Sequence, residues 1–339
     1  MRLDRQVRRH SPIKSALGSV RALSVTLCAL IATVGGALAE EWPARPIKLV
    51  VPYSAGGSGD IVARELAQKL TTYLDRSIYV ENRPGASGNL GTEYVAKSAP
   101  DGHTLLMASD IQFAISPNFT AGLPYELKDF EPVSLVANLD LVLAGHPSVG
   151  ANNLRELIDL ARKRPGEINY GSTGAGSTHQ LAMELLQQLG GFKLTEVPYR
   201  GSAQALPDLL SGQLHIMLMG IPQSLPYMRE GKLNALAVGA LQRVASIPDV
   251  PTISEQGFPG FEADNYWCLY APAGTQKGII ARLQQGTARA LAAPDLRERF
   301  MATGLTPVGS TPHLLATRIA ADSAKWTNVI RSLRLNEVK

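Results

Sequence analysis

Short runs of apolar residues alternate along the chain with longer segments in which apolar residues recur every three or four positions. The first short run, residues 47–53, is followed by residues 60–74, where Ile61, Leu66 and Leu70 fall on one helical face. Strands are expected at residues 77–82 and 103–109, with a helix at residues 86–99 between them. This strand–helix alternation predicts a parallel sheet covered by helices.

A long extended segment at residues 134–147 separates this unit from a second one of the same kind. The pattern there predicts strands at residues 167–172, 193–199, 214–220 and 233–239 and helices at residues 154–166, 178–191, 203–212 and 225–231. A second extended segment follows at residues 261–275, and helices at residues 277–291 and 311–333 end the pattern. The sequence therefore predicts two α/β units that are joined twice.

The two extended segments predict a two-lobe α/β fold in which each lobe is a mainly parallel sheet flanked by helices. Lobe I is expected to be discontinuous and to comprise residues 40–141 and 265–339, and lobe II to comprise residues 142–264. The two hinge crossings are expected near residues 137–143 and 265–270. Because ligands of such sheets bind beyond the carboxyl ends of the strands, a cleft is expected between the lobes.

Residues 1–39 have the features of a secretory signal peptide. They hold a basic start and a short apolar run at residues 22–34, and they end on Ala37–Leu38–Ala39. The apolar run is too short for a stable membrane span. We therefore expect cleavage near Ala39 and a periplasmic location.

Removing residues 1–39 changes the charge of the chain. The 339 residues carry 33 basic and 29 acidic residues, of which residues 1–39 hold 6 and 1, so 27 and 28 remain and the net charge becomes −1. No basic run remains, so no nucleic-acid partner is expected. Apolar residues make up 45% of the full sequence, which is enough for a real core.

Few residues suggest catalysis or a metal. Cys268 is the single cysteine after residue 39 and lies in an apolar strand, where a buried inert thiol is expected. The histidines are scattered without the spacing of a zinc site, and the hydrolase motif G-x-S-x-G is absent. We therefore expect no catalytic residue, no metal, no cofactor and no enzyme.

Two loops, residues 54–60 and 172–179, combine glycines with hydroxyl side chains just before a helix, at matching places in the two expected lobes. Free N–H groups and the dipole at a helix N-terminus favour an anion. The same residue types are also ordinary helix caps and turn residues, and for any single loop that reading is preferred. For the pair of loops, we favour anion binding. Similar loops precede the helices near residues 86 and 202.

The loops suit a carboxylate better than a nucleotide. Gly174–Ala175–Gly176 resembles part of a dinucleotide fingerprint, but His179 stands where a small residue is required. Few cations lie near the loops, which suits one or two carboxylates held by neutral donors. His179 is either a ligand contact or a plain first-turn residue, Arg200 either pairs with a carboxylate or lies on the surface, and Asp60 is expected to be a first-turn residue.

Five segments together resemble the solute receptors of tripartite tricarboxylate transporters, the Bug family. The combination of "VENRPGASGN", "APDGHTLL" and "DVPTISEQGFPGF" is specific, and the resemblance covers nearly the whole chain after residue 39. The segments are residues 42–64, 80–109, 168–186, 197–218 and 233–275.

This resemblance implies a type II periplasmic binding fold whose lobes close on a ligand and deliver it to the membrane components of the transporter. It also implies carboxylate binding through backbone groups and ordered water, with ligand loops at residues 53–60 and 172–179. The family often has Phe at the place of Tyr53 and Asp or Asn near Met219–Gly220, and its loop at residues 108–115 is commonly richer in glycine; these departures concern ligand identity. The candidate ligand-binding residues are Tyr53, Ser54, Ala55, Gly56, Gly57, Ser58, Asp60, Ser109, Ser172, Thr173, Gly174, Ser177, Thr178, His179 and Arg200.

The expected ligand is a small carboxylate: a di- or tricarboxylate, an amino acid or an aromatic acid. The protein is expected to act as a monomer. The alternative is a secreted hydrolase or a ligand sensor on the same fold, because one fold can host several functions. A transport receptor binds its ligand without turnover, and this property separates the two classes.

Overall fold

The computed structural model describes residues 42–333, and residues 45–333 build the fold. The expected signal peptide lies outside the described residues. The first strand set consists of β1 (Ile47–Val51), β2 (Ile78–Asn82) and β3 (Thr104–Ser109), which pair in parallel in the order β2-β1-β3. Helices α2 (Ser58–Leu74) and α3 (Asn89–Ala96) lie in the connections between these strands, so the predicted alternation is confirmed here.

The two extended segments form the long strands β4 (Phe130–Gly145) and β9 (Asp264–Pro272). Strand β9 runs antiparallel to both β3 and β4. Strand β4 pairs with β9 as far as Asp140 and with β7 from Leu141 onward, so one strand continues through both halves of the sheet. The sheet is therefore mixed, since the crossing strands add antiparallel pairs to the expected parallel ones. The predicted lobe boundaries stay a prediction.

The second strand set consists of β5 (Asn169–Ser172), β6 (Thr195–Pro198) and β7 (Ile216–Gly220), parallel in the order β6-β5-β7. Strands β7 and β8 (Asn234–Val238) pair antiparallel with β4. The helices in these connections are α5 (Leu154–Lys163), α6 (Thr178–Gly190), α7 (Ser202–Ser211) and α8 (Ile221–Arg229).

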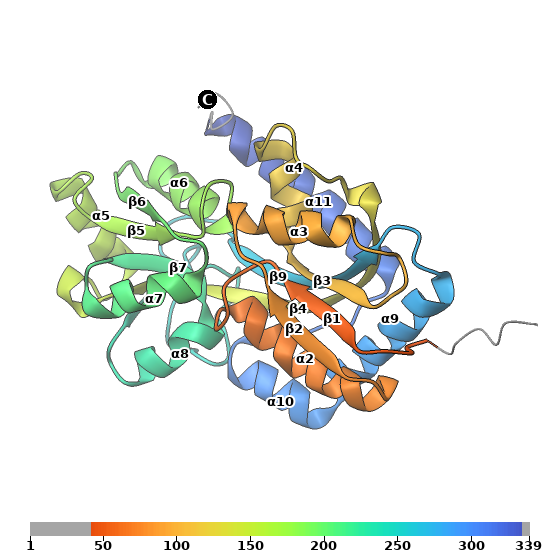
Figure 1. The fold of residues 1–339 in the computed structure, drawn as a ribbon. Helices are drawn as coiled ribbons and strands as arrows, with labels where there is room; N and C mark the ends of the chain where they lie inside the picture. The colour runs from red at the N-terminus through yellow and green to blue at the C-terminus, as the bar shows by residue number, and fades with distance from the viewer. Residues whose placement is uncertain (1–41, 334–339) are drawn as a thin grey trace, which may run out of the picture. The chain divides into compact units, whose positions relative to one another are not determined.

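Helices cover both faces of each strand set (Figure 1). Helices α2 and α10 (Pro294–Ala302) lie below the first set, and α3 and α11 (Pro312–Ser332) lie above it. In the second set, α6 lies above the strands, and α7 and α8 lie below them. Helix α9 (Lys277–Ala292) was expected, whereas α4 (Ser116–Phe119), α10 and β10 (Leu305–Pro307) were not predicted.

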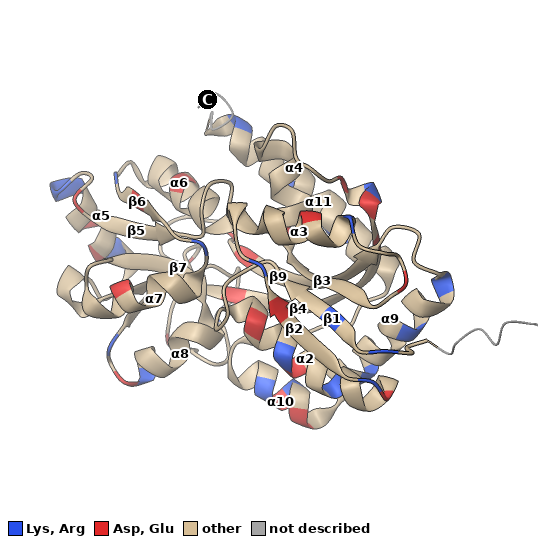
Figure 2. Cartoon of the chain, viewed as in Figure 1, with Lys and Arg blue, Asp and Glu red and all other residues tan. Residues whose placement is uncertain are grey.

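The core of the first strand set is aromatic. Phe113 packs against Tyr125, Phe130 and Tyr270, with ring centroids 4.4 to 6.2 Å apart. Cys268 is fully buried in the same core, which confirms the expected buried thiol, and burial raises its pKa well above the usual value. Acidic and basic residues are interspersed along the helices (Figure 2). Within residues 42–333, no helix has both the length and the apolar character needed to cross a membrane.

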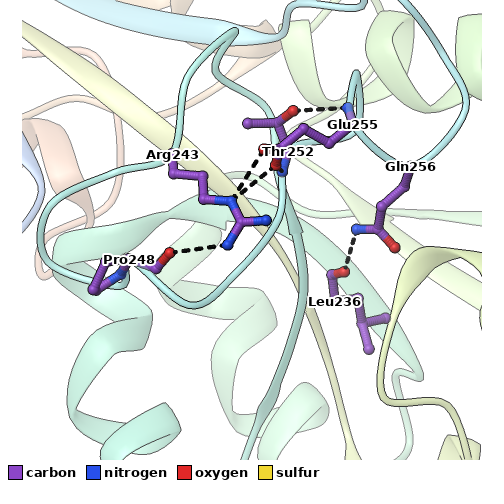
Figure 3. Close-up of polar contacts among 6 residues, drawn as sticks. All are labelled: Leu236, Arg243, Pro248, Thr252, Glu255 and Gln256. Carbon is purple, nitrogen blue, oxygen red and sulfur yellow. Dashed lines mark hydrogen bonds and ion pairs between the residues drawn. The ribbon is translucent and has the colours of Figure 1, made fainter.

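The connection from β8 to β9 is held by side chains (Figure 3). Arg243 Nε donates to Glu255 Oε2 at 3.0 Å, and the same carboxylate oxygen accepts the Thr252 backbone N–H at 2.7 Å. Hydrogen bonds from the Thr252 backbone and from Arg243 keep the pKa of Glu255 below its usual value. This segment leads the chain into β9, two residues of which reach the candidate site.

Candidate functional site

The loop before α2 is ordered around Asp60. Its carboxylate accepts the Gly56 N–H at 2.9 Å, Arg64 Nε at 2.9 Å and Asn82 Nδ2 at 3.0 Å. Burial opposes the charge on Asp60, but these hydrogen bonds outweigh burial and lower its pKa. Asp60 therefore stabilises the conformation of the loop through these hydrogen bonds. It lies in the first turn of α2, where a carboxylate also interacts favourably with the helix dipole.

Tyr53 joins this loop to the end of β3. Its hydroxyl lies 3.0 Å from Ser109 Oγ and accepts Gln112 Nε2 at 2.9 Å. Burial raises the pKa of Tyr53, so the phenol stays neutral. The Tyr53 ring meets the Trp267 ring edge to face at 5.6 Å. Ser109 thus positions Tyr53, and Tyr53 packs against an aromatic residue of β9.

In and next to the loop before α6, the hydroxyls of residues 172, 177 and 178 form hydrogen bonds with other protein groups. Ser172 Oγ donates to Glu196 at 2.6 Å and accepts the Gly174 N–H, while Ser177 Oγ caps α6 by accepting the Gln180 N–H. Thr178 donates to Asp110 at 2.7 Å. These three side chains hold the loop in shape, and they point to protein atoms.

Thr173 and His179 have a different place, because both line a small internal cavity. Thr173 Oγ1 lies 3.0 Å from His179 Nδ1. Burial lowers the pKa of His179 to about 4, so the imidazole is neutral at pH 7. A neutral imidazole next to a hydroxyl offers hydrogen bonds without adding a charge.

The cavity, of about 30 Å³, is lined by residues from both strand sets. The predicted residues on its wall are Tyr53, Ser54, Gly57, Ser58, Thr173 and His179. The lining residues outside the list of candidates are Gly59, Ile111, Leu139, Gly201, Ser202, Gly220, Asn265 and Trp267. None of these lining residues is Lys, Arg, Asp or Glu, so the wall carries no formal charge.

Four helices begin at the cavity wall. They are α2 at Ser58, α6 at Thr178, α7 at Ser202 and α8 just after Gly220. A helix N-terminus carries a partial positive charge and N–H groups that have no partner inside the helix; Ser177 already accepts one of these N–H groups in α6, and Pro222 has none to offer in α8. The arrangement can therefore stabilise an anion without a cationic side chain.

The remaining predicted residues do not line this cavity. Ala55 and Gly56 form the exposed tip of their loop. Gly174 and the exposed Arg200 line a separate depression beside Ser87 and Phe119. In the loop of Arg200, the neighbouring Ser202 reaches the cavity, and it donates to Gln223 Oε1 at 2.6 Å. A signal for Ser202 was present, because it begins a helix after a glycine.

Three buried polar atoms on the cavity wall have no hydrogen-bond partner among residues 42–333. They are Ser54 Oγ, Asn265 Oδ1 and Trp267 Nε1. A buried polar atom without a partner costs free energy, so such atoms are exceptions in native proteins. Their position on one wall indicates a ligand-binding surface.

Metal binding has no comparable support in the described part of the chain, where no group of three or more His, Cys, Asp or Glu side chains is placed to hold an ion.

A family model described as the tripartite tricarboxylate transporter family receptor matches residues 62–335. Protein BugT of Bordetella pertussis is 39% identical over 306 residues, which cover 89% of this chain and 94% of that protein. A solved structure of the periplasmic binding protein BugD is 31% identical, has a TM-score of 0.84, and is matched over 87% of this chain and 99% of that one.

Two further solved structures hold small carboxylates. One, from R. palustris with adipate, is 33% identical with a TM-score of 0.84 over 86% of this chain and 98% of that one. The other, MatC from Rhodopseudomonas palustris with bound malate, is 32% identical with a TM-score of 0.81 over 85% and 100%. The expected fold class is therefore confirmed, and these neighbours are solute-binding proteins rather than enzymes.

Proposed function

The chain belongs to the tripartite tricarboxylate transporter receptor family, among its Bug proteins, and from this premise we propose that it captures a small carboxylate and delivers it to the membrane components of such a transporter. The observation that carries the proposal is the meeting of four helix N-termini at one buried cavity without a charged side chain on its wall. Backbone N–H groups and hydroxyls there suit a carboxylate. The relatives with adipate and malate support this ligand class.

Binding requires movement of the loops. The cavity of about 30 Å³ has room for about one water molecule, so a carboxylate enters only when its walls separate. The walls come from residues 53–59 on one side and residues 173–220 on the other, and β4 and β9 connect the two strand sets. Closure of lobe I (residues 40–141 and 265–339) on lobe II (residues 142–264) around a ligand accounts for these facts, with hinges in the connecting strands.

The family supports a periplasmic location. A signal peptide at residues 1–39 accounts for export and is then removed. Mass spectrometry of protein from the periplasm should therefore find an N-terminus at or near Glu40. An intact Met1 in that compartment would contradict cleavage. Action as a monomer is tested by light scattering on the same sample.

A receptor binds without turnover, which sets it apart from a hydrolase on this fold. Calorimetry against a panel of di- and tricarboxylates, amino acids and aromatic acids should find a binder, and chromatography should recover that compound unchanged. A chemically altered compound would favour the enzyme instead. Small-angle scattering should show a smaller radius of gyration with the bound acid.

A single substitution, compared with a matched control variant, tests where the ligand binds. A Cβ on Gly57 would lie 3.4 Å from Ser54 O and 3.6 Å from Ser202 Oγ, so Gly57→Trp fills the cavity and should abolish binding. Gly278→Trp is the control, because Gly278 is exposed in α9 with open space around it. Normal affinity of Gly57→Trp would place the ligand elsewhere.

A further inference from the structure

Asn265 and Trp267 are alternate residues of β9, so their side chains lie on the same face of the strand. They are 3% and 5% exposed, and both line the cavity. Asn265 Oδ1 and Trp267 Nε1 are the unpartnered atoms described above. The first is a hydrogen-bond acceptor, and the second is a donor that cannot accept.

The indole of Trp267 is held in place by its neighbours. Its ring meets Tyr53 edge to face, and α2 approaches it so closely at Gly59 that a Cβ there would lie 2.4 Å from the ring carbon Cη2. Because the ring has so little room, the position of its N–H is set before a ligand arrives. A donor with a fixed position discriminates between ligand groups better than a mobile one.

Asn265 and Trp267 together favour a different ligand group from the one that the helix N-termini favour. With the Asn265 amide oriented as in this structure, a carboxylate, which only accepts hydrogen bonds, leaves Oδ1 unpaired, whereas an ammonium only donates and leaves the Trp267 N–H unpaired. No acidic side chain on the cavity wall would balance an ammonium. A hydroxyl both donates and accepts, so it matches the pair.

We propose that Asn265 and Trp267 form a second subsite that binds a ligand hydroxyl, so that the ligand is a hydroxycarboxylate. The proposal rests on the proposed function, since the helix N-termini hold the carboxylate. It assigns selectivity to two residues of β9, which lie more than 80 positions from either predicted ligand loop.

Calorimetry with acids that differ only by a hydroxyl tests the subsite in the full chain after signal-peptide removal. The pairs are lactate and propionate, malate and succinate, and citrate and tricarballylate. We expect the hydroxy acid of the best-binding pair to bind at least about tenfold tighter, as a lost hydrogen bond to a buried partner predicts. Trp267→Phe and Asn265→Ala should each weaken binding of the hydroxy acid far more than binding of the deoxy acid, and so remove most of this difference.

Tyr266→Phe is the control, because Tyr266 lies between the two residues and faces the opposite side of β9. It should keep the preference for the hydroxy acid. Equal affinity for both members of every binding pair would overturn the subsite, and so would variants that weaken both acids alike. If no acid of the panel binds at all, the proposed function fails, and the subsite fails with it.

Discussion

The hydroxyl of Ser87 donates to the carbonyl of Ala175 at 2.8 Å, and thereby joins the loop before α3 to the loop before α6. Ser87 has a φ of +53°, an uncommon conformation for a residue with a side chain. Its own carbonyl accepts Gln112 Nε2 at 2.8 Å, which holds the backbone in that conformation. A loop of the first strand set is thus fixed in a shape that reaches the second.

Ser87→Ala should loosen this contact between the two loops. Without the hydrogen bond, the open form becomes more populated, and ligand affinity should fall about two- to tenfold. Small-angle scattering without ligand should report a larger radius of gyration. Ser98→Ala is the matched control, because Ser98 donates to Tyr94 within the same segment. An unchanged scattering curve for Ser87→Ala would show that this bond does not hold the loops together.

Asp110→Asn should change the pH dependence of stability. Burial raises the pKa of Asp110 to about 8, and the nearby carboxylates of Asp264 and Asp322 also raise it, whereas the hydrogen bond from Thr178 and a backbone hydrogen bond oppose them. The unfolded carboxyl titrates near 3.9, so the folded state binds a proton that the unfolded state lacks between about pH 4 and pH 8. Wild-type stability should therefore fall as pH rises through this window.

Urea unfolding at pH 5 and pH 8 measures this effect. Asn cannot ionise and still accepts from Thr178, so the variant should gain stability over the wild type by up to about 1.4 kcal/mol per pH unit. The charged and polar groups around Asp110, including the ion pair of Arg318 with Asp264, stay the same in both proteins. Asp249→Asn, at an exposed position, serves as the control. Parallel pH profiles for the wild type and Asp110→Asn would contradict the prediction.

Gly59→Ala should disturb the cavity through Trp267. Because the new Cβ would lie 2.4 Å from the indole, the ring must shift, and we expect a loss of about 1–3 kcal/mol in stability and at least tenfold in ligand affinity. Gly278→Ala is matched to it, since Gly59 and Gly278 are both the second residue of a helix. With open space around it, Gly278→Ala should keep or slightly raise stability. Wild-type affinity in Gly59→Ala would show that the indole position does not matter.

Gln256→Ala should lower stability without affecting the ligand. Gln256 Nε2 donates to Leu236 O at 2.9 Å (Figure 3), and its Oε1 accepts the Leu154 N–H at 3.0 Å. Both leucines are buried, so the truncation leaves a backbone donor and an acceptor unpaired, at a cost of about 1–3 kcal/mol. Chemical unfolding measures this loss. Gln188→Ala on the exposed face of α6 should be nearly neutral, and a neutral Gln256→Ala would refute the role given to these bonds.

The α/β alternation and the position of the glycine loops follow from the amino-acid sequence alone. These features are local: strands such as β7 are continuous apolar runs, α2 repeats its apolar residues every three or four positions, and a loop such as residues 54–57 takes its shape from nearby glycines and the helix that follows. The prediction therefore reached Tyr53 and Ser58 on the cavity wall, and it reached His179 at the start of α6.

Which side chains share the cavity depends on how distant parts of the chain pack together. Ser172 and Arg200 carry the right chemistry, yet one bonds to Glu196 and the other lies in a separate depression. Asn265 and Trp267 look like ordinary strand residues in the sequence, because period-two alternation does not say what a strand faces. Their role depends on β9 passing between the two strand sets, next to β3 and β4. Contacts between residues this distant are made by packing, and no local pattern encodes them.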